Sequence, residues 1–521
     1  MPQAINSIII LGGGTAGWLC AGVLAARVIK DFEDPPSITL IESPNVPSVG
    51  VGEGTWPTMR STLKKMGIRE TDFIRECHVS FKQGAQFNQW TTGAPDDTYF
   101  HPLMLPRSFN DINLAPHWLG QKREKSFSES VCPQDALCLK GLAPKNITTA
   151  EYSGIANYAY HLDAGAFSSF LQKHCTKNLG VRHIKANVTD VNSSVNGDIA
   201  SLTIDNTTEG SREIAGDLFI DCSGFKSLLL GEHYKVPFKS CQDILFIDRA
   251  LAVHLPYPST DSPIASHTIS TAQEAGWIWD IGLSSRRGVG HVYSSAHTSA
   301  DQAYQRLAQY AEQSGHRLDE LTVRDIPIEP GHRTKFWQNN CVAVGLSAGF
   351  LEPLEASALV LVEISADMIA SQLPSNRAVM DIVAQRFNKT FSYRWERIIE
   401  FLKLHYLLSK RDDSDFWIDN RRPDTIPTSL QELLELWRHQ APWDSDFDHA
   451  TEVFPAASYQ YVLYGMGFDT DVATRQLSTV QKQRAAAEFM HNAQATKQLI
   501  SALPSNRELL NKIYQYGLSS V

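Results

Sequence analysis

A glycine-rich turn near the start of the chain constrains the fold more than any other feature of the sequence. The apolar run 7–11 predicts a short strand, and Gly12, Gly14 and Gly17 follow it in the pattern GxGxxG. The first glycine allows a tight turn, the second lets a pyrophosphate approach the backbone, and the third lets a helix pack closely on the strand. The predicted nucleotide contacts of this turn are Gly12, Gly14, Thr15, Ala16 and Gly17.

The residues after the turn complete a nucleotide-binding unit. Apolar residues recur at helical spacing over 16–30, and the run 37–42 predicts a second strand that ends in Glu42. The order strand, glycine turn, helix, strand and acid predicts a Rossmann-type βαβ unit, in which Glu42 is placed to bind a ribose hydroxyl.

Two later apolar runs predict further strands of the same parallel sheet. They cover 217–224 and 340–346, and both end in small residues, as expected at a carboxyl edge where ligands bind. The nucleotide domain is therefore predicted to be discontinuous, with inserts at about 80–210 and 240–330. The part between about 240 and 300 is rich in predicted strands. Leu346, at the end of the last strand, joins the predicted cofactor contacts.

The identity of the nucleotide follows from the number of glycine motifs. A second glycine-rich loop covers 50–55 and adds Gly52 and Glu53 to the predicted contacts, but only one convincing GxGxxG is present. A second nicotinamide domain is therefore not expected. The strand at 217–224 is similar to the strand that flavoprotein monooxygenases place against FAD. We expect one FAD and no stable NAD site.

Composition excludes several classes of function. The chain of 521 residues has 43% hydrophobic and 20% charged residues, which is typical of a globular protein with a large core. Its formal net charge of -10 argues against nucleic acid as a partner. No apolar run is long enough to span a membrane. Eight scattered cysteines without a CxxC pair predict reduced thiols, with no metal site and a cytoplasmic location.

The C-terminal third changes in character. Helical periodicity covers 377–408, 428–438 and 479–503, with no internal repeat. The predicted organisation is therefore a flavin module over 1–365, followed by a mostly helical region over 366–521 that covers the substrate.

Three short segments carry chemistry only when they are taken together. They are Ser80-Phe81-Lys82-Gln83-Gly84, Gly276-Trp277-Ile278-Trp279-Asp280-Ile281, and Phe350-Leu351-Glu352-Pro353-Leu354-Glu355. Each has a plain structural explanation: a surface lysine, an aromatic core strand, and a turn before a helix whose positive dipole end favours acids. Their combination, order and span resemble the flavin-dependent halogenases of the tryptophan halogenase family, from about Ser7 to about Phe468.

The resemblance implies a reaction and a role for several residues. Reduced flavin, O2 and chloride or bromide give hypohalous acid, which a lysine passes to an aromatic ring. That lysine falls on Lys82, which would act as a hydrogen-bonding guide or form a haloamine; the residues leave both open. The family's acid falls on Glu355, which would take the ring proton or polarise the halogen donor. The tryptophan pair, Trp277 and Trp279, would separate flavin from substrate. His101 and Pro353 are further predicted substrate or tunnel residues.

The sequence departs from the family pattern at two places. Ala356, Ser357 and Ala358 stand where the family has Ser, Thr and Gly; the backbone amides of Ser357 and Ala358 are still predicted to bind halide. Alanine for glycine nevertheless removes backbone freedom, so a preference for chloride over bromide is not assumed. Gly282 stands where the family signature W-x-W-x-I-P has proline.

The substrate and the partners are less constrained. Phe454, Tyr459 and Tyr461 are candidates to sandwich a ring or to form part of the core, so tryptophan, indole and other electron-rich aromatics all stay open. The resemblance implies a separate NAD(P)H-dependent flavin reductase as partner, and a homodimer is an open alternative. Three other functions stay open: a flavoprotein aromatic monooxygenase, which would hydroxylate without Lys82; an uncoupled oxidase or reductase-type flavoprotein, which would consume FADH2 without modifying an aromatic; and a non-catalytic FAD-binding protein.

Overall fold

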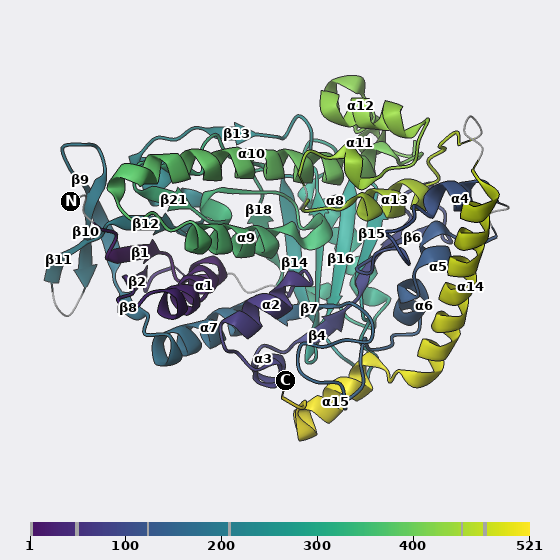
Figure 1. The fold of residues 1–521 in the computed structure, drawn as a ribbon, viewed down its shortest axis with the longest axis horizontal. Helices are drawn as coiled ribbons and strands as arrows, with labels where there is room; N and C mark the ends of the chain where they lie inside the picture. Colours follow the sequence, from purple (N-terminus) through teal and green to yellow (C-terminus); the bar gives the residue numbers. More distant parts are fainter. Residues whose placement is uncertain are drawn as a thin grey trace. The chain divides into compact units, whose positions relative to one another are not determined.

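The computed structural model describes residues 4–46, 52–121, 124–206, 210–449, 452–472 and 477–520. Contacts group the chain into two compact units, each built from three stretches of sequence (Figure 1). Unit 1 comprises Met1–His78, Leu162–Cys241 and Glu329–Trp395, and unit 2 comprises Val79–His161, Gln242–Ile328 and Glu396–Val521. These units do not coincide with the predicted modules 1–365 and 366–521, so that functional division stays a prediction.

Unit 1 is built on a six-stranded, mainly parallel sheet. Its strand order is β20 (Trp337–Gln338), β21 (Cys341–Ala343), β12 (Leu218–Asp221), β1 (Ser7–Leu11), β2 (Ser37–Glu42) and β8 (Arg182–Lys185). Only β20 runs antiparallel to its neighbour. In the middle of the sheet, Ile9 lies between Thr39 and Phe219. The predicted βαβ unit and the discontinuous parallel sheet are confirmed.

Helices and small sheets surround this central sheet. Helix α1 (Thr15–Asp31) packs against α7 (Ala164–Asn178) and α9 (Ser357–Ser371), as Figure 1 shows. The other elements of unit 1 are β3 (Gly52–Gly54), α2 (Thr58–Lys65), α3 (Glu70–Glu76), an antiparallel sheet of β9 (Asn187–Ser193), β10 (Ile199–Asn206) and β11 (Gly210–Ala215), and a sheet of β13 (Phe238–Ser240), β19 (Gly331–Arg333) and β22 (Gly349–Phe350).

Unit 2 is built on a seven-stranded, mainly antiparallel sheet. Its order is β18 (Arg324–Pro327), β14 (Arg249–Pro256), β17 (Arg286–Tyr293), β16 (Gly276–Gly282), β15 (Thr268–Gln273), β5 (Gly84–Asn88) and β6 (Thr98–Pro102). Helix α8 (Ala300–Glu312) packs on β14 and β17, and its Leu307 shares a buried apolar cluster with Ile278 and Val289. The strand-rich character predicted for 240–300 is confirmed.

The remaining elements of unit 2 are one short strand and several helices. They are β4 (Ser80–Lys82), α4 (Ala115–Leu119), α5 (Phe127–Val131), α6 (Gln134–Leu139), α11 (Asp415–Asp419), α12 (Thr428–Trp437), α13 (Ala456–Gly465), α14 (Thr479–Ala502) and α15 (Asn506–Tyr516). Strand β7 (Ala159–Asp163) and helix α10 (Arg377–Leu407) contain boundaries between the units. The predicted helices at 377–408, 428–438 and 479–503 are confirmed to within one residue at each end.

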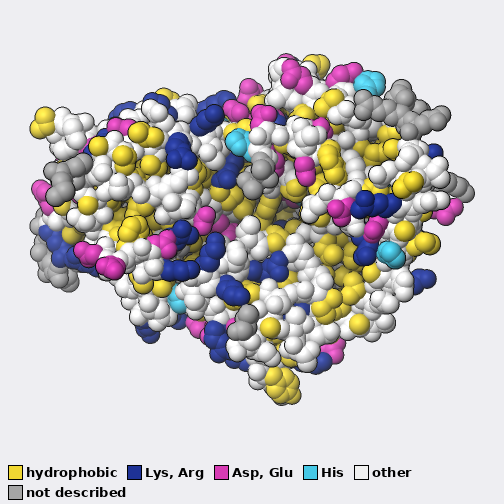
Figure 2. Space-filling model, in the orientation of Figure 1, with side chains coloured by type: hydrophobic (Ala, Val, Ile, Leu, Met, Phe, Trp, Pro, Cys, Tyr) yellow, Lys and Arg dark blue, Asp and Glu magenta, His cyan; other side chains and the backbone are white. Residues whose placement is uncertain are grey.

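The structure bears on three predictions made from composition: the charge of the surface, membrane spans and the cysteines. On the face drawn in Figure 2, basic and acidic side chains are interspersed and form no single basic area. Among the helices of the described residues, none is both long and apolar enough to cross a membrane. All eight cysteines lie within the described ranges, and each is a buried free thiol.

Candidate active site

The glycine turn adopts the close packing that its sequence predicts. Gly12 has φ +119°, and a Cβ placed there would lie 2.1 Å from the carbonyl oxygen of Cys222, just after the neighbouring strand β12. A Cβ on Gly17 would lie 1.9 Å from the Gly12 carbonyl oxygen. Gly14 differs, because a Cβ there meets nothing within 4 Å. The first and third glycines are therefore required by the protein's own packing, whereas the second faces open space.

The end of β2 lies beside this turn. A Cβ on Gly13 would lie 2.3 Å from Cδ of Glu42, so the Glu42 side chain rests against the glycine turn. His183 of β8 also contacts Glu42, with Nε2 lying 2.8 Å from Glu42 Oε2. Burial lowers the pKa of His183. Sequence reasoning missed His183, because the strand that carries it is short and half exposed.

A second set of predicted contacts closes around the start of α1. Gly345 (φ +71°) begins a 3₁₀ turn, Gly345–Ser347, and a Cβ on it would lie 2.7 Å from the Cβ of Ala16. Leu346, on this turn, is 37% exposed. Thr15 donates a hydrogen bond of 3.4 Å to the Ala164 carbonyl at the start of α7. Thus α1, α7 and the turn after β21 meet at one edge of the sheet.

Asp221 organises the turn after β12 and was also missed. Its carboxylate is fully buried and accepts hydrogen bonds from the backbone N–H groups of Ser223, Leu229 and Leu230. These bonds draw the chain out of the sheet, which explains why the strand predicted over 217–224 ends at residue 221. The strand predicted over 340–346 similarly ends at residue 343, because the turn at Gly345 follows.

The second glycine-rich loop is partly described. Gly50 and Val51 lie outside the described residues, whereas Gly52 is buried in β3. Burial raises the pKa of Glu53 to about 7, so this carboxyl group is about half protonated at neutral pH. A neutral carboxyl group can donate as well as accept a hydrogen bond.

These features fit a dinucleotide such as FAD. The open space at Gly14 lies at the N-terminus of a 17-residue helix, where free N–H groups and the helix dipole favour a pyrophosphate. The Glu42 carboxylate lies beside the same turn and suits a ribose hydroxyl. The residues that would hold FAD are therefore together in unit 1, as predicted.

The Glu355 segment forms a strained turn at the start of α9. Glu355 (φ 63°, ψ 7°) and Ala356 (φ 55°, ψ 42°) both have left-handed backbone conformations. The Trp56 indole N–H donates a hydrogen bond of 2.9 Å to the Glu355 carbonyl oxygen. Ser357, the first residue of α9, is 5% exposed, whereas Ala358 and Pro353 are exposed. The first N–H groups of a helix have no partner within it, and Ala356 offers no capping side chain.

Lys82 is buried rather than on the surface. It lies at the end of β4 in unit 2, and its residue is only 4% exposed. Hydrogen bonds hold the residues around Lys82 in place. Ser80 Oγ donates to Gly282 O at 2.5 Å, and the Gln83 backbone N–H donates to Ser266 O at 2.7 Å. Asn506 Nδ2 donates to Phe81 O at 3.2 Å. Lysine is rarely buried to this extent unless its amine is paired.

Two histidines accompany Lys82 and were not among the predicted site residues. In the antiparallel pair β4–β7, Ser80 lies opposite His161 and Lys82 opposite Ala159. His161 therefore shares a strand face with Lys82 as its diagonal neighbour. Burial and then the Lys82 charge hold the pKa of His161 well below its usual range. Burial also lowers the pKa of His267 to about 4. Both imidazoles are consequently neutral at physiological pH.

The predicted tryptophan pair lies on one face of β16. Trp277 and Trp279 are buried, with ring centroids 6.4 Å apart. The opposite face carries Ile278, packed in the α8 cluster, and Asp280, which pairs with Arg287 and accepts a hydrogen bond from Tyr310. Residues two apart on a strand share a face, so this division follows from the spacing of the two tryptophans.

His101 and the C-terminal aromatics lie in the core of unit 2. His101 Nε2 lies 2.9 Å from Ser458 Oγ. Phe454 stacks on Phe401 at a centroid distance of 3.8 Å, and Tyr459 lies 4.9 Å from the same ring. Phe454, Tyr459 and Tyr461 are at most 2% exposed. Of the two explanations that the sequence left open for these aromatics, the structure supports the core.

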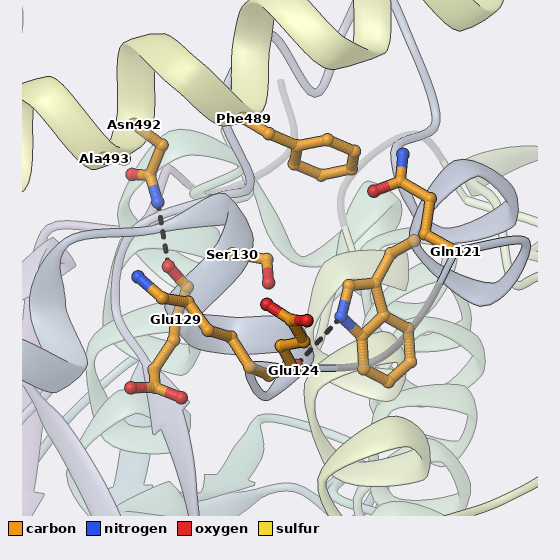
Figure 3. A pocket seen from close by; sticks show the side chains of 9 residues that line it. Gln121, Glu124, Glu129, Ser130, Phe489, Asn492 and Ala493 are labelled. Carbon is orange, nitrogen blue, oxygen red and sulfur yellow. Dashed lines mark hydrogen bonds between the residues drawn. The ribbon is translucent and has the colours of Figure 1, made fainter.

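A separate pocket in unit 2 lies between α14 and the segment around α5. Its volume is about 190 Å³, and Figure 3 shows Asn492 of α14 donating a hydrogen bond to the Glu129 carbonyl at its wall. Trp118, Lys125 and Phe489 also line it. None of the predicted site residues does.

Comparisons with known proteins agree with the geometry. A protein-family model described as tryptophan halogenase matches residues 7–482. The chain is 30% identical to tryptophan 6-halogenase SttH of Streptomyces toxytricini, over 96% of this chain and 97% of that protein.

Two solved structures extend the similarity to the fold. The crystal structure of tryptophan halogenase from Shewanella frigidimarina has a TM-score of 0.96 and 50% identity, and covers 100% of this chain and 99% of its own. Tar14, a tryptophan C-6 flavin-dependent halogenase from taromycin biosynthesis, has a TM-score of 0.89 and 31% identity, over 98% of this chain and 100% of its own.

Proposed function

We propose that this chain halogenates an electron-rich aromatic ring through hypohalous acid. The premise is that the chain belongs to the tryptophan halogenase family and is a flavin-dependent halogenase. Members of this family generally use FAD, a halide and O2, act on an aromatic substrate, and depend on a separate flavin reductase. The observation that carries the proposal is the buried Lys82 on a strand held by hydrogen bonds at Ser80, Phe81 and Gln83.

Unit 1 is proposed to bind FAD. The contacts are Gly12, Gly14, Thr15, Ala16, Gly17, Glu42, Gly52, Glu53 and Leu346. When bound in its reduced form, the flavin supplies the oxidation FADH2 + O2 + X⁻ + H⁺ → FAD + HOX + H2O. The open space at Gly14 and the acid beside it support this assignment. With one GxGxxG in the chain, the reduced flavin is proposed to come from a separate NAD(P)H-dependent flavin reductase.

Lys82 is proposed to direct hypohalous acid to the ring. Its burial removes competing water and gives the amine a fixed position, since both neighbouring residues are hydrogen-bonded to the chain. His161, on the same strand face, is neutral, so it adds no second positive charge beside the lysine. Both modes of action, hydrogen bonding and haloamine formation, remain consistent with this environment.

Glu355 is proposed to take the proton that leaves the ring in ArH + HOX → ArX + H2O. Its left-handed backbone conformation supports a functional role, because strained residues cluster at active sites. The backbone N–H groups of Ser357 and Ala358 are proposed to bind chloride or bromide, as the first N–H groups of a helix suit an anion. Pro353 is proposed to shape the approach to this turn.

Trp277 and Trp279 are proposed to keep the ring of the substrate away from the flavin. His101, which is buried and lies beside Ser458, is proposed as a substrate or tunnel residue. Free tryptophan, indole and related electron-rich rings are the proposed substrates. The enclosed aromatics Phe454, Tyr459 and Tyr461 are not proposed to hold the ring.

The hydroxylase and non-catalytic alternatives are not favoured, because the family match spans the segments of Lys82, Trp277 and Glu355 together. We further propose a cytoplasmic location, from the reduced thiols, and a functional division at about residue 365. A homodimer remains one proposal for the assembly.

The test is mass spectrometry of reactions that contain the protein, FAD, a flavin reductase, NADH, bromide or chloride, and a panel of indoles with free tryptophan. A halogen isotope pattern is expected for at least one substrate, and it should vanish with Lys82→Met. The matched control is Lys145→Met. Lys145 is also fully buried in unit 2, but its amine is hydrogen-bonded to Ala150 O and to the Tyr158 hydroxyl.

Lys145→Met should lower stability and keep halogenation per folded protein. Equal halogenation by wild type and Lys82→Met would overturn the role of Lys82. An oxygen adduct without halogen would instead favour the hydroxylase.

A further inference from the structure

Two consecutive left-handed residues precede α9, and neither is a glycine or asparagine. Glu355 has φ 63° and Ala356 has φ 55°. Residues with a Cβ disfavour this conformation, and alanine has no polar side chain that could stabilise it locally. The turn therefore depends on contacts from elsewhere in unit 1.

The peptide group between these two residues is held at both of its polar atoms. The Ala356 N–H donates to the Pro353 carbonyl at 3.1 Å. The Glu355 carbonyl oxygen accepts a hydrogen bond of 2.9 Å from the indole Nε1–H of Trp56, which lies 299 residues earlier in the chain. The plane of this peptide is thus fixed, and that plane sets the direction of the N–H groups that follow.

Trp56 is itself anchored to the helix that the turn begins. It stands two residues before α2, and two hydroxyls of α2 bind the buried Glu363 of α9: Thr62 Oγ1 donates at 2.6 Å and Thr58 Oγ1 at 3.3 Å. Glu363 lies six residues after the start of α9. Therefore α2 is joined to α9 by hydrogen bonds to Glu363, and Trp56, just before α2, is joined to the turn at the start of α9. Trp56 is thus held beside the Glu355 turn.

We propose that Trp56 is a positioning residue for this turn: its indole N–H fixes the Glu355–Ala356 peptide, and with it the Glu355 carboxylate and the halide-binding amides of Ser357 and Ala358. The inference rests on the proposed roles of Glu355 and of these amides. It adds that their geometry depends on one donor outside the segment, which is needed because Ala356 lacks the flexibility of glycine.

The direct test is Trp56→Phe, which keeps an aromatic ring and removes the N–H. Halide binding, measured by ⁸¹Br NMR line broadening without turnover, should weaken about fivefold, the change that the loss of one neutral hydrogen bond produces. In turnover, the KM for bromide should rise by a similar factor and kcat should fall, while FAD affinity stays unchanged.

The matched control is Trp337→Phe. Trp337 also lies in unit 1 and donates its indole N–H at 3.0 Å to the carbonyl of a left-handed residue, Asn339 (φ 52°). Its loss should leave halide binding and the KM for bromide unchanged. An equal effect of both variants would mean that Trp56 contributes only to general stability, which would overturn the proposal.

A rescue separates positioning from packing. Ala356→Gly added to Trp56→Phe should restore part of the halide affinity, because glycine adopts the left-handed conformation without cost. A packing defect at Trp56 would not respond to residue 356. If Trp56→Phe does not fold, replacement by β-(3-benzothienyl)alanine, which keeps the bicyclic ring and lacks the N–H, carries the same expectations.

The two levels of inference can fail separately. Full activity of Glu355→Gln would remove the proposed role of Glu355, whereas wild-type halide binding by Trp56→Phe would remove the role of Trp56. Loss of halide binding with unchanged FAD affinity in Trp56→Phe supports the positioning role, whether or not Glu355→Gln is active.

Discussion

Glu42 at the end of β2 lies between the glycine turn and His183, with its Oε2 2.8 Å from the histidine Nε2. The Glu42 side chain also rests against Gly13, and so lies beside the start of α1, where a ribose is expected. This relationship gives the first prediction.

Glu42→Gln should weaken FAD binding by about tenfold, since hydrogen bonds to a charged group contribute roughly 1.5–3 kcal/mol. Titration of the apoprotein with FAD, followed by flavin fluorescence, measures the change. Glu33→Gln, at an exposed acid after α1, is the control and should bind FAD as wild type does. Unchanged affinity in Glu42→Gln would remove Glu42 from the cofactor contacts.

The glycine turn predicts opposite outcomes for two alanine substitutions. Gly14→Ala should leave thermal stability unchanged, because φ is -74° and a Cβ meets nothing within 4 Å, yet its methyl group should obstruct the pyrophosphate and weaken FAD binding. Gly12→Ala should instead destabilise the protein, because the methyl group would lie 2.1 Å from Cys222 O. Thermal unfolding and FAD titration on both variants check this. Retained FAD affinity in Gly14→Ala would contradict the proposed binding mode.

Glu363 predicts a dependence of stability on pH. Burial raises its pKa to about 8, whereas an unfolded glutamate has a pKa near 4.5. The folded state then binds the extra proton, so this residue's contribution falls by up to about 1.4 kcal/mol per pH unit as pH rises from about 4.5 to 8. Glu363→Gln should remove that loss, so the free energy of unfolding of the variant should depend less on pH.

Urea unfolding of the wild type and of Glu363→Gln between pH 5.5 and 8.5 provides the measurement. The difference between the two free energies of unfolding should move in favour of the variant with increasing pH. A constant difference would show that the Glu363 carboxyl group is ionised throughout.

The burial of Phe454 predicts that its replacement lowers stability rather than substrate binding. It is 1% exposed and stacks on Phe401, so Phe454→Ala should lower the free energy of unfolding by about 3–5 kcal/mol. The KM for the aromatic substrate, measured at a temperature where the variant stays folded, should change little. A large rise in KM without loss of stability would show that Phe454 contributes to substrate binding instead.

His161 should remain neutral across the working range of pH. Its pKa is held well below its usual value, first by burial and then by the Lys82 charge. Nitrogen-15 chemical shifts of the imidazole should therefore report the neutral ring from pH 8 down to pH 6. Titration near pH 6.5, as for a solvent-exposed histidine, would contradict the burial of this strand face.

Local patterns predicted those parts of the fold in which the signal is local. The strands at 7–11 and 37–42 have the predicted bounds, since each is an apolar run that ends at a glycine turn or an acid. The faces of β16 follow from period-two alternation alone. The helix at 479–503 was predictable because the segment is a long run rich in strong helix formers such as alanine, glutamine and lysine.

Contacts between distant segments could not be predicted in this way. Nothing near Trp56 indicates that its indole will meet a carbonyl 299 residues later, and nothing near Ala356 indicates a left-handed conformation. The pairing of His161 with the Lys82 strand depends on a three-residue register that no periodicity encodes. The roles of Lys82 and Glu355 themselves rest on family resemblance and stay predictions.

The division of each unit into three stretches of sequence has a consequence for how the chain is made. The central sheet of unit 1 contains β1 from the first residues and β21 from beyond residue 340, so a ribosome must synthesise most of the chain before that sheet can close. Until then, the apolar faces of β1 and β2 have only part of their cover. Pairings of such long range form slowly and expose strands meanwhile. Expression at reduced temperature or with chaperones should therefore increase the yield of native protein.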